Sequence, residues 1–355
     1  NRLEFEKRLT ESLKHENIEN NQHAMCFLDL DQFKVINDTC GHAAGDELLR
    51  QLCDVLKNSI RHNDTLARIG GACYLAKDAG RNRIHVHHPD DVDMAQRRGE
   101  VQWVTKIHSA LAEHRFLLYA QPIVSLKDQA SHHFELLLRM KDSSSRIIAP
   151  GAFLPAAERY DIIEKLDHWV VKNSFRILSE SADFLATVNF ISINLSGKSL
   201  SSDSLLETII TSLYESEIPA NKICFEITET AAIANFSHAL KFINQLKHKG
   251  FLFALDDFGT GLSSFGYLKQ MPVDFLKIDG IFIKEISQNP IDYEFVKSIN
   301  RIGHVMGMKT IAEFVENEDI LEKLTEIGVD YAQGYAVGKP VELESLIRDR
   351  ERPAR

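Results

Sequence analysis

Apolar and polar residues alternate in a regular order over the last two thirds of the chain. Short runs rich in Val, Ile, Leu and Phe end in a polar residue, and segments with helical periodicity separate most of them. Eight runs can be read: Phe116–Val124, His133–Met140, Phe190–Leu195, Ile223–Thr228, Phe251–Leu255, Phe275–Ile278, Lys309–Ala312 and Tyr331–Val337. The clearest amphipathic segments are Leu205–Ser216, Ser237–Lys249, Asp292–Met306 and Asn317–Ile327. This alternation predicts parallel strands and an α/β fold of the (β/α)8 barrel kind over residues 113–350.

The residues at the ends of these runs carry oxygen atoms or positive charge. Functional groups of such barrels lie where the strands end. The end residues are Glu135, Asn194, Glu226, Asp256, Asp257, Lys277, Glu313 and Gln333. Taken alone, a pair of aspartates is more often a solvated acidic turn than a site. The other end residues favour a site, because a purely structural barrel has no need of such a ring.

The ligand types indicate the chemistry. Carboxylates and a carboxamide, without His or Cys, are hard donors that favour Mg²⁺ or Mn²⁺ over zinc. Two such ions are the usual arrangement for cleavage of a phosphodiester, and Arg139 could fork onto its phosphate oxygens. Lys277 could hydrogen-bond the attacking water or accept its proton, because burial and nearby cations lower a lysine pKa. The alternative for Lys277 is a plain salt bridge to a rim carboxylate.

The first 90 residues predict a smaller α/β unit of a different kind. A β-rich run ends in Asp29, and the turn after it suits a triphosphate and its metal ion. Residues 91–112 have helical spacing of apolar positions and predict a linker helix. The expected organisation is therefore a unit over residues 1–90, a helix over 91–112 and the barrel over 113–350.

The motifs of the C-terminal region together resemble the EAL domain family, whose members hydrolyse cyclic di-GMP to linear pGpG. The motifs are Glu135-Leu-Leu-Leu-Arg139, Asn194-Leu-Ser196, Phe225-Glu-Ile-Thr-Glu229, Asp256-Asp-Phe-Gly-Thr-Gly261, Lys277-Ile-Asp279, Ala312-Glu-Phe-Val-Glu316 and Gln333-Gly-Tyr335. The first motif has Leu136 where the family name has alanine. Neighbours on a strand face opposite sides, so we expect this change to affect packing and not metal binding.

The resemblance implies a role for each motif residue. It implies metal ligation by Glu135, Asn194, Glu226, Asp256, Asp257 and Glu313. Lys277 and Gln333 match positions that hold the catalytic water. Gln121, Arg139, Asp279 and Glu316 are expected to contact the nucleotide. Glu229 matches a glutamate that braces the loop of Gly259 and Gly261, which the family couples to activity and to dimerisation, so a homodimer is expected.

The N-terminal motifs resemble half of a GGDEF, or diguanylate cyclase, domain. They are Phe27-Leu-Asp-Leu-Asp-Gln-Phe-Lys-Val-Ile-Asn-Asp38 and Gly45-Asp-Glu-Leu-Leu49. The resemblance implies that Asp29 holds Mg²⁺ and that Asn37 and Asp46 read the guanine of GTP. The acidic pair expected after Gly71 is absent, through a deletion or a stretch missing from this sequence, and we favour the second. As written, this region cannot make cyclic di-GMP.

Composition sets wider bounds. The 355 residues suit about two domains, and a net charge of −10 disfavours nucleic acid as a partner. No run reaches membrane-spanning length and no signal peptide opens the chain, so we expect a cytoplasmic location, with anchoring by upstream segments left open. Three alternatives to a cyclic di-GMP phosphodiesterase without cyclase activity remain. They are a non-hydrolysing receptor for cyclic di-GMP, a dual cyclase and phosphodiesterase if the missing segment is intact, and a hydrolase of another phosphodiester.

Overall fold

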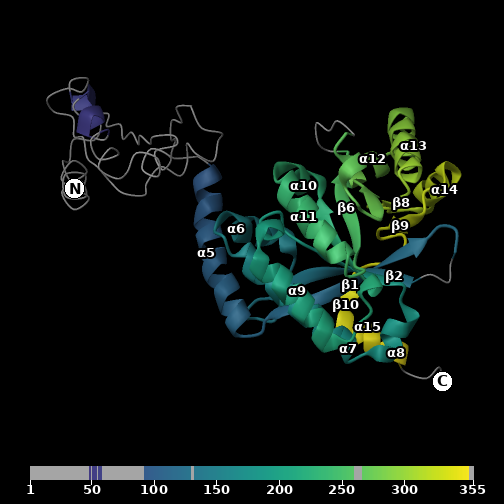
Figure 1. Cartoon of the computed structure of the whole chain (residues 1–355), viewed down its shortest axis with the longest axis horizontal. Helices are drawn as coiled ribbons and strands as arrows, with labels where there is room; N and C mark the ends of the chain where they lie inside the picture. The colour runs from purple at the N-terminus through teal and green to yellow at the C-terminus, as the bar shows by residue number, and fades with distance from the viewer. Residues whose placement is uncertain are drawn as a thin grey trace. The chain divides into compact units, whose positions relative to one another are not determined.

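The computed structural model divides the chain into two compact units, Asn1–Val92 and Asp93–Arg355, which are considered separately (Figure 1). The structure describes residues 92–128, 132–259 and 266–351, together with a piece of helix at residues 48, 50–53 and 55–57. The expected GTP contacts Asp29, Asn37 and Asp46 lie outside the described residues, as do Gly71 and Gly261. The fold below is that of the second unit.

Eight strands of this unit close into a barrel. They are β1 (Phe116–Ser125), β2 (His132–Lys141), β4 (Phe190–Asn194), β5 (Ile223–Thr228), β6 (Leu252–Phe258), β7 (Phe275–Ile278), β8 (Lys309–Ala312) and β9 (Tyr331–Gln333). The order is β1-β9-β8-β7-β6-β5-β4-β2, and pairing of β1 with β2 closes the ring. Two short strands, β3 (Ile147–Ile148) and β10 (Val341–Glu342), pair with β2 and β1. The predicted barrel is confirmed, with a strand at each of the eight expected runs.

The direction of β1 differs from the expected all-parallel arrangement. Strand β1 runs antiparallel to both of its barrel neighbours, β2 and β9, whereas the other seven barrel strands are parallel to one another. Only residues 126–131 separate β1 from β2. A parallel connection needs a crossover of a dozen or more residues, so this short segment makes a hairpin instead.

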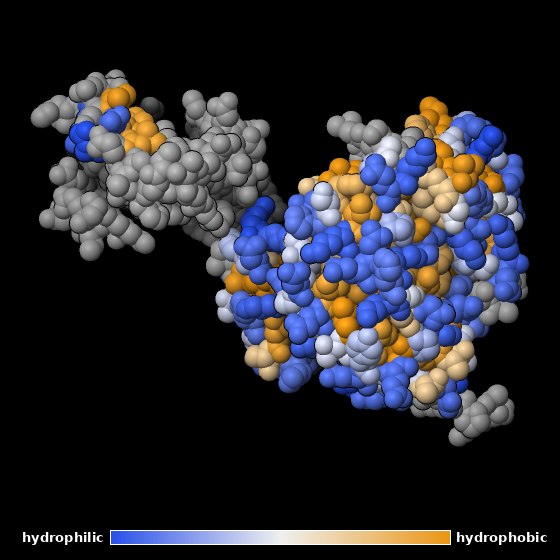
Figure 2. Space-filling model, viewed as in Figure 1, coloured by the Kyte–Doolittle hydropathy of each residue, from blue (hydrophilic) through white to orange (hydrophobic). Residues whose placement is uncertain are grey.

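Helices surround the barrel. The longer ones are α7 (Ile163–Ser179), α9 (Asp203–Ser216), α11 (Phe236–Lys247), α13 (Pro290–Val305), α14 (Glu318–Ile327) and α15 (Leu343–Glu351). The shorter ones are α6 (Leu154–Arg159), α8 (Ala182–Thr187), α10 (Glu229–Ala234) and α12 (Gly280–Ile283), with 3-10 turns η1 (Pro150–Ala152), η2 (Ser199–Ser201), η3 (Ala220–Lys222) and η4 (Leu268–Gln270). Their apolar stripes pack on the outward side of the strands and leave a largely polar outer face (Figure 2).

Side-chain caps explain where several of these helices begin. Ser202, Asn289 and Asn317 each accept a hydrogen bond from a backbone N–H in the first turn of α9, α13 and α14, respectively. Such caps satisfy one of the N–H groups that a helix start leaves unpaired. Leu136 lies in the same apolar layer between strands and helices, as expected for the neighbour of Glu135 on a strand.

A further helix, α5 (Val92–Ala112), precedes the barrel where a linker helix was expected. Ile107 and Ala110 are fully buried and pack in one apolar cluster with Phe116, Ile163 and Leu166. The last turns of α5 are therefore part of the packed second unit. No helix in the described part of the chain has the length and apolarity needed to cross a membrane.

The barrel interior is apolar at the end where the parallel strands begin. Phe190, Phe275 and Tyr331 meet there, and the His133 ring lies against Phe190 and Tyr331, with ring centres 4.3 and 4.9 Å apart. Nδ1 of His133 is buried without a hydrogen-bond partner. Burial therefore lowers the pKa of His133 from 6.5 to about 4, despite a hydrogen bond with the backbone of Ile123.

We expect His133→Phe to reduce the loss of stability in mild acid. The unfolded chain protonates this histidine near pH 6.5 and the folded barrel only near pH 4, so its contribution to stability is complete above pH 6.5 and is lost between pH 6.5 and 4. Unfolding by urea, measured at several pH values in this window, should show a shallower decline for the variant. His133→Phe should differ in this respect from His132→Phe at the exposed neighbouring position; equal slopes would contradict the assignment.

Candidate functional site

A buried lysine at the end of β7 is the centre of the polar rim. Nζ of Lys277 lies 2.6 Å from Glu226, 2.8 Å from Glu313, 3.2 Å from Asp256 and 3.4 Å from Glu135, measured to the nearest carboxylate oxygens. The four carboxylates come from the ends of β5, β8 and β6 and from the middle of β2. Glu135 and Glu313 are 178 positions apart in the sequence, and the fold brings both to the same lysine.

Glu135 connects this centre to the neighbouring strands. One of its oxygens accepts a hydrogen bond from Nδ2 of Asn194 (2.6 Å), and the other accepts one from Nε2 of Gln333 (2.5 Å). Nε2 of Gln333 also lies 3.3 Å from Oε1 of Gln121 on β1, and Gln121 in turn donates to the carbonyl of Gly338. Glu135, Asn194, Gln333 and Gln121 therefore form one hydrogen-bonded group with Lys277.

Two adjacent aspartates reach the same rim because β6 is irregular. Neighbouring residues of a regular strand face opposite sides. The pairing of β6 with β7 shifts register between Leu255 and Phe258, and Asp257 has a left-handed backbone with φ of 55°. The backbone N–H of Asp257 donates to Oδ1 of Asp256 at 2.9 Å. A bulge of this kind redirects a side chain, so both carboxylates serve one site.

Burial and mutual repulsion make most of these carboxylates unusually basic. Burial raises the pKa of Glu226 well above its usual range and also raises that of Asp256; the Glu135 charge adds to both. The pKa of Glu313 is raised to about 8 by burial and the charges of Asp256 and Glu135, and that of Asp257 to about 6 by burial and Asp256. One lysine therefore does not balance the charge of this rim.

Glu135 and Lys277 behave differently from the other members. Burial would raise the pKa of Glu135, but Lys277 and hydrogen bonds from Gln333 and Asn194 outweigh it and lower this pKa. Burial opposes the charge of Lys277, but the surrounding carboxylates, Asp256 first, hold its pKa well above the usual range. Facing these carboxylates, Lys277 is a charged donor; the lowered pKa was expected beside bound cations and stays a prediction.

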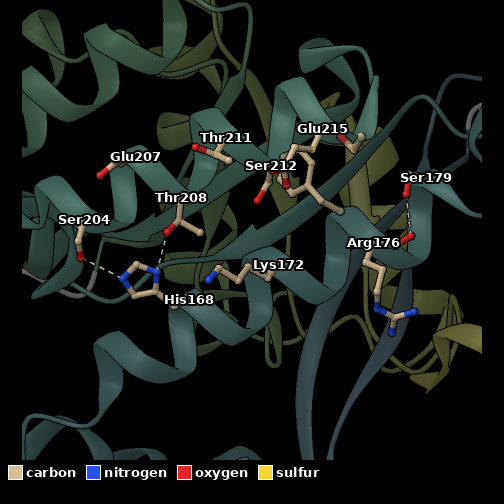
Figure 3. A pocket seen from close by; sticks show the side chains of 12 residues that line it. His168, Lys172, Arg176, Ser179, Ser204, Glu207, Thr208, Thr211, Ser212 and Glu215 are labelled. Carbon is tan, nitrogen blue, oxygen red and sulfur yellow. Dashed lines mark hydrogen bonds between the residues drawn. The ribbon is translucent and has the colours of Figure 1, made fainter.

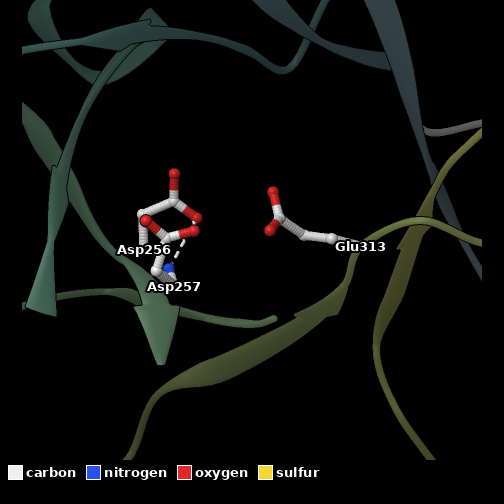
Figure 4. A group of neighbouring side chains, drawn as sticks. All are labelled: Asp256, Asp257 and Glu313. Carbon is white, nitrogen blue, oxygen red and sulfur yellow. Dashed lines mark hydrogen bonds between the residues drawn. The ribbon is translucent and has the colours of Figure 1, made fainter. Parts of the chain in front are cut away.

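The residues present fit divalent cations. Asp256, Asp257 and Glu313 each bring one carboxylate oxygen to within 4.8 Å of the others, and Figure 4 shows the two aspartates facing Glu313 across a gap. Among the residues that the structure describes, Oε1 of Glu226 has no hydrogen-bond partner although it is buried, and the same is true of Oε1 of Gln333. Excess negative charge, hard oxygen donors and an unsatisfied buried carboxylate oxygen are what Mg²⁺ or Mn²⁺ would satisfy.

Glu229 connects the two sides of a loop at the rim. It is fully buried at the start of α10. One carboxylate oxygen accepts a hydrogen bond from the backbone N–H of Gly259 (2.9 Å), and the other accepts one from the hydroxyl of Tyr267 (2.6 Å). These two partners flank residues 260–265, which lie outside the described part. The contact with Gly259 is the one expected, whereas no feature of the sequence indicated Tyr267.

The expected nucleotide contacts are less uniform. Arg139 is half-buried, with its guanidinium 5.4 Å from the ring centre of Tyr119. Asp279 caps α12 by accepting from the N–H of Ile281 (2.7 Å), and its charge helps to raise the pKa of Asp257. Glu316 is exposed and takes no part in the hydrogen bonds around Lys277 and Glu135. Its assignment stays a prediction.

Two exposed aromatic residues lie within the quoted motifs, and sequence reasoning gave them no role. Phe314 directly follows Glu313 and is 51% exposed; Tyr335 lies two positions after Gln333 and is 64% exposed. Phe314 also has a left-handed backbone, with φ of 52°, which is unusual for a bulky residue. Exposed aromatic side chains at a rim suit stacking on a planar base. Their position directly beyond the strand ends was the signal that could have found them.

A separate groove lies between α7 and α9 on the outside of the barrel (Figure 3). His168 lies between two hydroxyl groups there, with Ser204 on Nε2 at 3.1 Å and Thr208 on Nδ1 at 2.9 Å. Lys172 points toward the same side. The lining includes none of the rim residues, so this groove is not part of the carboxylate site.

Comparison with known families and structures agrees with this geometry. Residues 105–340 match the EAL domain, and residues 1–83 match the diguanylate cyclase, GGDEF domain. A complex titled "PaMucR Phosphodiesterase, c-di-GMP complex" has a TM-score of 0.65 and 32% identity, over 69% of this chain and 99% of that one. The FimX EAL domain of Pseudomonas aeruginosa bound to c-di-GMP has a TM-score of 0.63 and 29% identity, over 67% and 96%.

Curated relatives give the same family. Cyclic di-GMP phosphodiesterase PdeB of Shewanella oneidensis is 36% identical over 99% of this chain and 48% of its own length. Cyclic di-GMP phosphodiesterase PdeF of Escherichia coli is 35% identical over 72% of this chain and 34% of its own length. The alignment with PdeB runs over 417 positions against the 355 residues of this chain, so it contains gaps.

The chain spans about half the length of PdeB and about a third of PdeF. Within that span, the family match covers the barrel with its rim of carboxylates, and a partial GGDEF match precedes it. The fold, the motif order and the matched range lead to one assignment: this chain belongs to the EAL domain family.

Proposed function

We propose that this chain hydrolyses cyclic di-GMP to linear pGpG with two divalent cations, Mg²⁺ or Mn²⁺. The observation that carries the proposal is the ring of four carboxylates around Lys277, with Asp257 and Asn194 beside it, so that no oxygen ligand expected of the site is missing. The names of the relatives, cyclic di-GMP phosphodiesterases, support the same substrate. A complete ligand set favours turnover over a receptor that only binds.

The carboxylates and Asn194 would hold the cations. The ligands are Glu135, Asn194, Glu226, Asp256, Asp257 and Glu313. Bound cations of this kind polarise a phosphodiester and acidify a water molecule at neutral pH. They would also displace a proton from Glu313, whose pKa burial, together with the charges of Asp256 and Glu135, raises to about 8.

Lys277 and Gln333 would position the attacking water. The ammonium of Lys277 is fully buried and has three protons to donate, so it can hold a water oxygen at a fixed place. Arg139 would pair with the phosphate oxygens, and Gln121, Asp279 and Glu316 would contact the rest of the nucleotide. Glu229 would keep the loop after Gly259 in a productive position.

The N-terminal region would regulate this activity. Its match to the GGDEF domain supports GTP as a ligand, held by Asp29, Asn37 and Asp46. A relative named as a bifunctional diguanylate cyclase and phosphodiesterase, MucR of Pseudomonas aeruginosa, is 28% identical over 98% of this chain. Because the acidic pair after Gly71 is absent, we propose regulation and not cyclase activity. Identical rates of pGpG formation with and without GTP would argue against this role.

The proposal is tested by incubating the protein with cyclic di-GMP and Mg²⁺ or Mn²⁺. We expect pGpG to form, chelation by EDTA to stop it, and added Mn²⁺ to restore it. Tight binding of cyclic di-GMP without any pGpG would instead support the receptor. Faster cleavage of another phosphodiester in competition would support a different hydrolase.

Glu135→Ala tests the assignment of Glu135 as a metal ligand. It removes a ligand together with the partner of Asn194, Gln333 and Lys277, so we expect turnover to fall by at least about 100-fold and Mn²⁺ binding to weaken. Glu322→Ala, at an exposed position of α14, should leave both unchanged. Full activity in Glu135→Ala would refute the ligand assignment.

Lys277→Met should lower the rate more than it lowers substrate affinity. The side chain keeps its length but loses the ammonium that would hold the water, and this interaction strengthens in the transition state. We expect kcat to fall by about 100-fold or more, with KM changed by a few-fold at most. If KM rose while kcat stayed at the wild-type value, Lys277 would be a substrate-binding group and not a group that acts on the water.

We further propose that the barrel forms a homodimer through α12 and the first turns of α13. Ile281, Ile291 and Phe295 are 57%, 66% and 52% exposed there, and Figure 2 shows apolar atoms at the end of the molecule that carries α13. Large exposed apolar side chains close together are typical of an interface. We expect Ile291→Glu to shift the mass measured by analytical ultracentrifugation from dimer to monomer, while Val305→Glu at the far end of α13 should not.

A further inference from the structure

Asp167 is a buried acid outside the carboxylate rim. It lies in the second turn of α7 and is only 6% exposed. Its Oδ2 accepts hydrogen bonds from the backbone N–H of Ser196 (3.0 Å) and from the hydroxyl of Ser199 (2.6 Å). The hydroxyl of Ser196 donates to that of Ser199 at 3.0 Å. Asp167 therefore holds both ends of the turn that follows β4.

That turn directly continues the strand that carries Asn194. The backbone N–H of Leu195 donates to the carbonyl of Glu226, so the turn also borders a second rim residue. A Cβ atom on Gly197 would lie 2.7 Å from Cβ of Ala231, so the turn packs closely against α10. The turn is thus held between α7 on one side and α10 on the other.

Few contacts orient the side chain of Asn194. It is exposed, and among the residues that the structure describes its side chain has one hydrogen bond, the donation to Glu135. An amide can present its oxygen or its NH₂ group, and only the oxygen can bind a cation. The direction of this side chain therefore depends on the backbone of Asn194 and Leu195, which the turn at Ser196 and Ser199 controls.

Further contacts tie the same turn to the segment around α7. Nζ of Lys198 donates to Oδ1 of Asp161 (2.5 Å), and the hydroxyl of Ser202 donates to Glu164. These two bonds are exposed or half-exposed and are worth little individually. Asp167 differs because it is buried and bonds to the turn closest to Asn194.

Burial of Asp167 is costly for the fold. Within the described part of the chain no lysine or arginine forms an ion pair with it, and burial raises its pKa to about 6 in spite of the bonds from Ser196 and Ser199. At neutral pH such an acid is charged in a place that disfavours charge, so it lowers stability relative to an ordinary aspartate. A residue that is retained at a cost in stability is a candidate for a functional role.

We propose that Asp167 is a positioning residue for Asn194: it fixes the turn at Ser196 and Ser199 so that the Asn194 amide oxygen stays directed at the cation site. This inference rests on the proposed metal-dependent function. It implies that loss of Asp167 weakens the affinity for the cation. Once the protein is saturated with metal, the turnover rate should change much less. Partners of this kind behind a metal ligand typically affect affinity by about 10- to 100-fold.

The experiment measures Mn²⁺ binding to the full chain without substrate, from the EPR signal of free Mn²⁺. We expect Asp167→Ala to weaken binding by about 10-fold and Ser199→Ala by a smaller factor in the same direction. Asp167→Asn should keep most of the affinity, because its amide oxygen can accept the same two hydrogen bonds. Asp183→Ala, at an exposed position in α8, removes the same charge and should leave affinity unchanged.

Turnover provides the second readout. At saturating Mn²⁺, we expect Asp167→Ala and Ser199→Ala to form pGpG at rates within about two-fold of wild type, since the ligands themselves remain. Circular dichroism and thermal unfolding report whether each variant is folded. Ser199→Ala deletes a single hydroxyl group, so it provides the test if Asp167→Ala does not fold.

Two results would overturn the inference. One is wild-type Mn²⁺ affinity in folded Asp167→Ala and Ser199→Ala; the other is an equal loss of affinity in Asp183→Ala, which would indicate a general charge effect. Failure of the proposed function looks different. In that case the wild-type protein binds Mn²⁺ without forming pGpG, while the ranking of Mn²⁺ affinities among the variants still holds.

Discussion

The balance of charge around Lys277 is the constraint on which the rest of this structure depends. Removing ionised groups from water is expensive unless each has a partner, and here one ammonium faces four carboxylates. Burial raises the pKa of Glu226 and that of Glu313, the latter to about 8, which shows how strongly this place disfavours further negative charge. Divalent cations would balance that charge. The barrel keeps the acids together although they repel, because each stands on, or directly after, a strand that is paired on both sides.

The same constraint explains the hydrogen bonds behind the acids. Glu135 has a lowered pKa because Lys277, Gln333 and Asn194 all donate to it, so it is the fixed anion of the group. Asp256 and Asp257 share the rim only through the irregular backbone of β6. Left-handed backbone at Asp257 is a local cost that the surrounding barrel sustains. Such strain indicates that the placement of the Asp257 carboxylate matters more here than the local stability of the backbone.

Much of the fold could be predicted from the sequence, and the missing parts have physical causes. The strands could be predicted because apolar runs with polar ends recur along the sequence. The direction of β1 could not be predicted, because the pattern of apolar and polar residues is the same for a parallel and an antiparallel strand. The rim residues were found because each ends a run. The raised pKa of Lys277, the contact of Tyr267 with Glu229 and the bond of Asp167 to Ser199 were missed, since they arise only when distant segments meet.

The antiparallel course of β1 decides where the chain joins the barrel. In an all-parallel barrel the first strand begins at the end of the barrel opposite the rim that carries the acids. Here the first residue of β1, Phe116, pairs with Met140 near the last residue of β2, so the chain joins the barrel at the end that carries the rim. The helix that precedes it, α5, is anchored there through Ile107 and Ala110. The described chain before the barrel is therefore joined at the end of the strands that carries the acids, and not at the opposite end, a full strand length away.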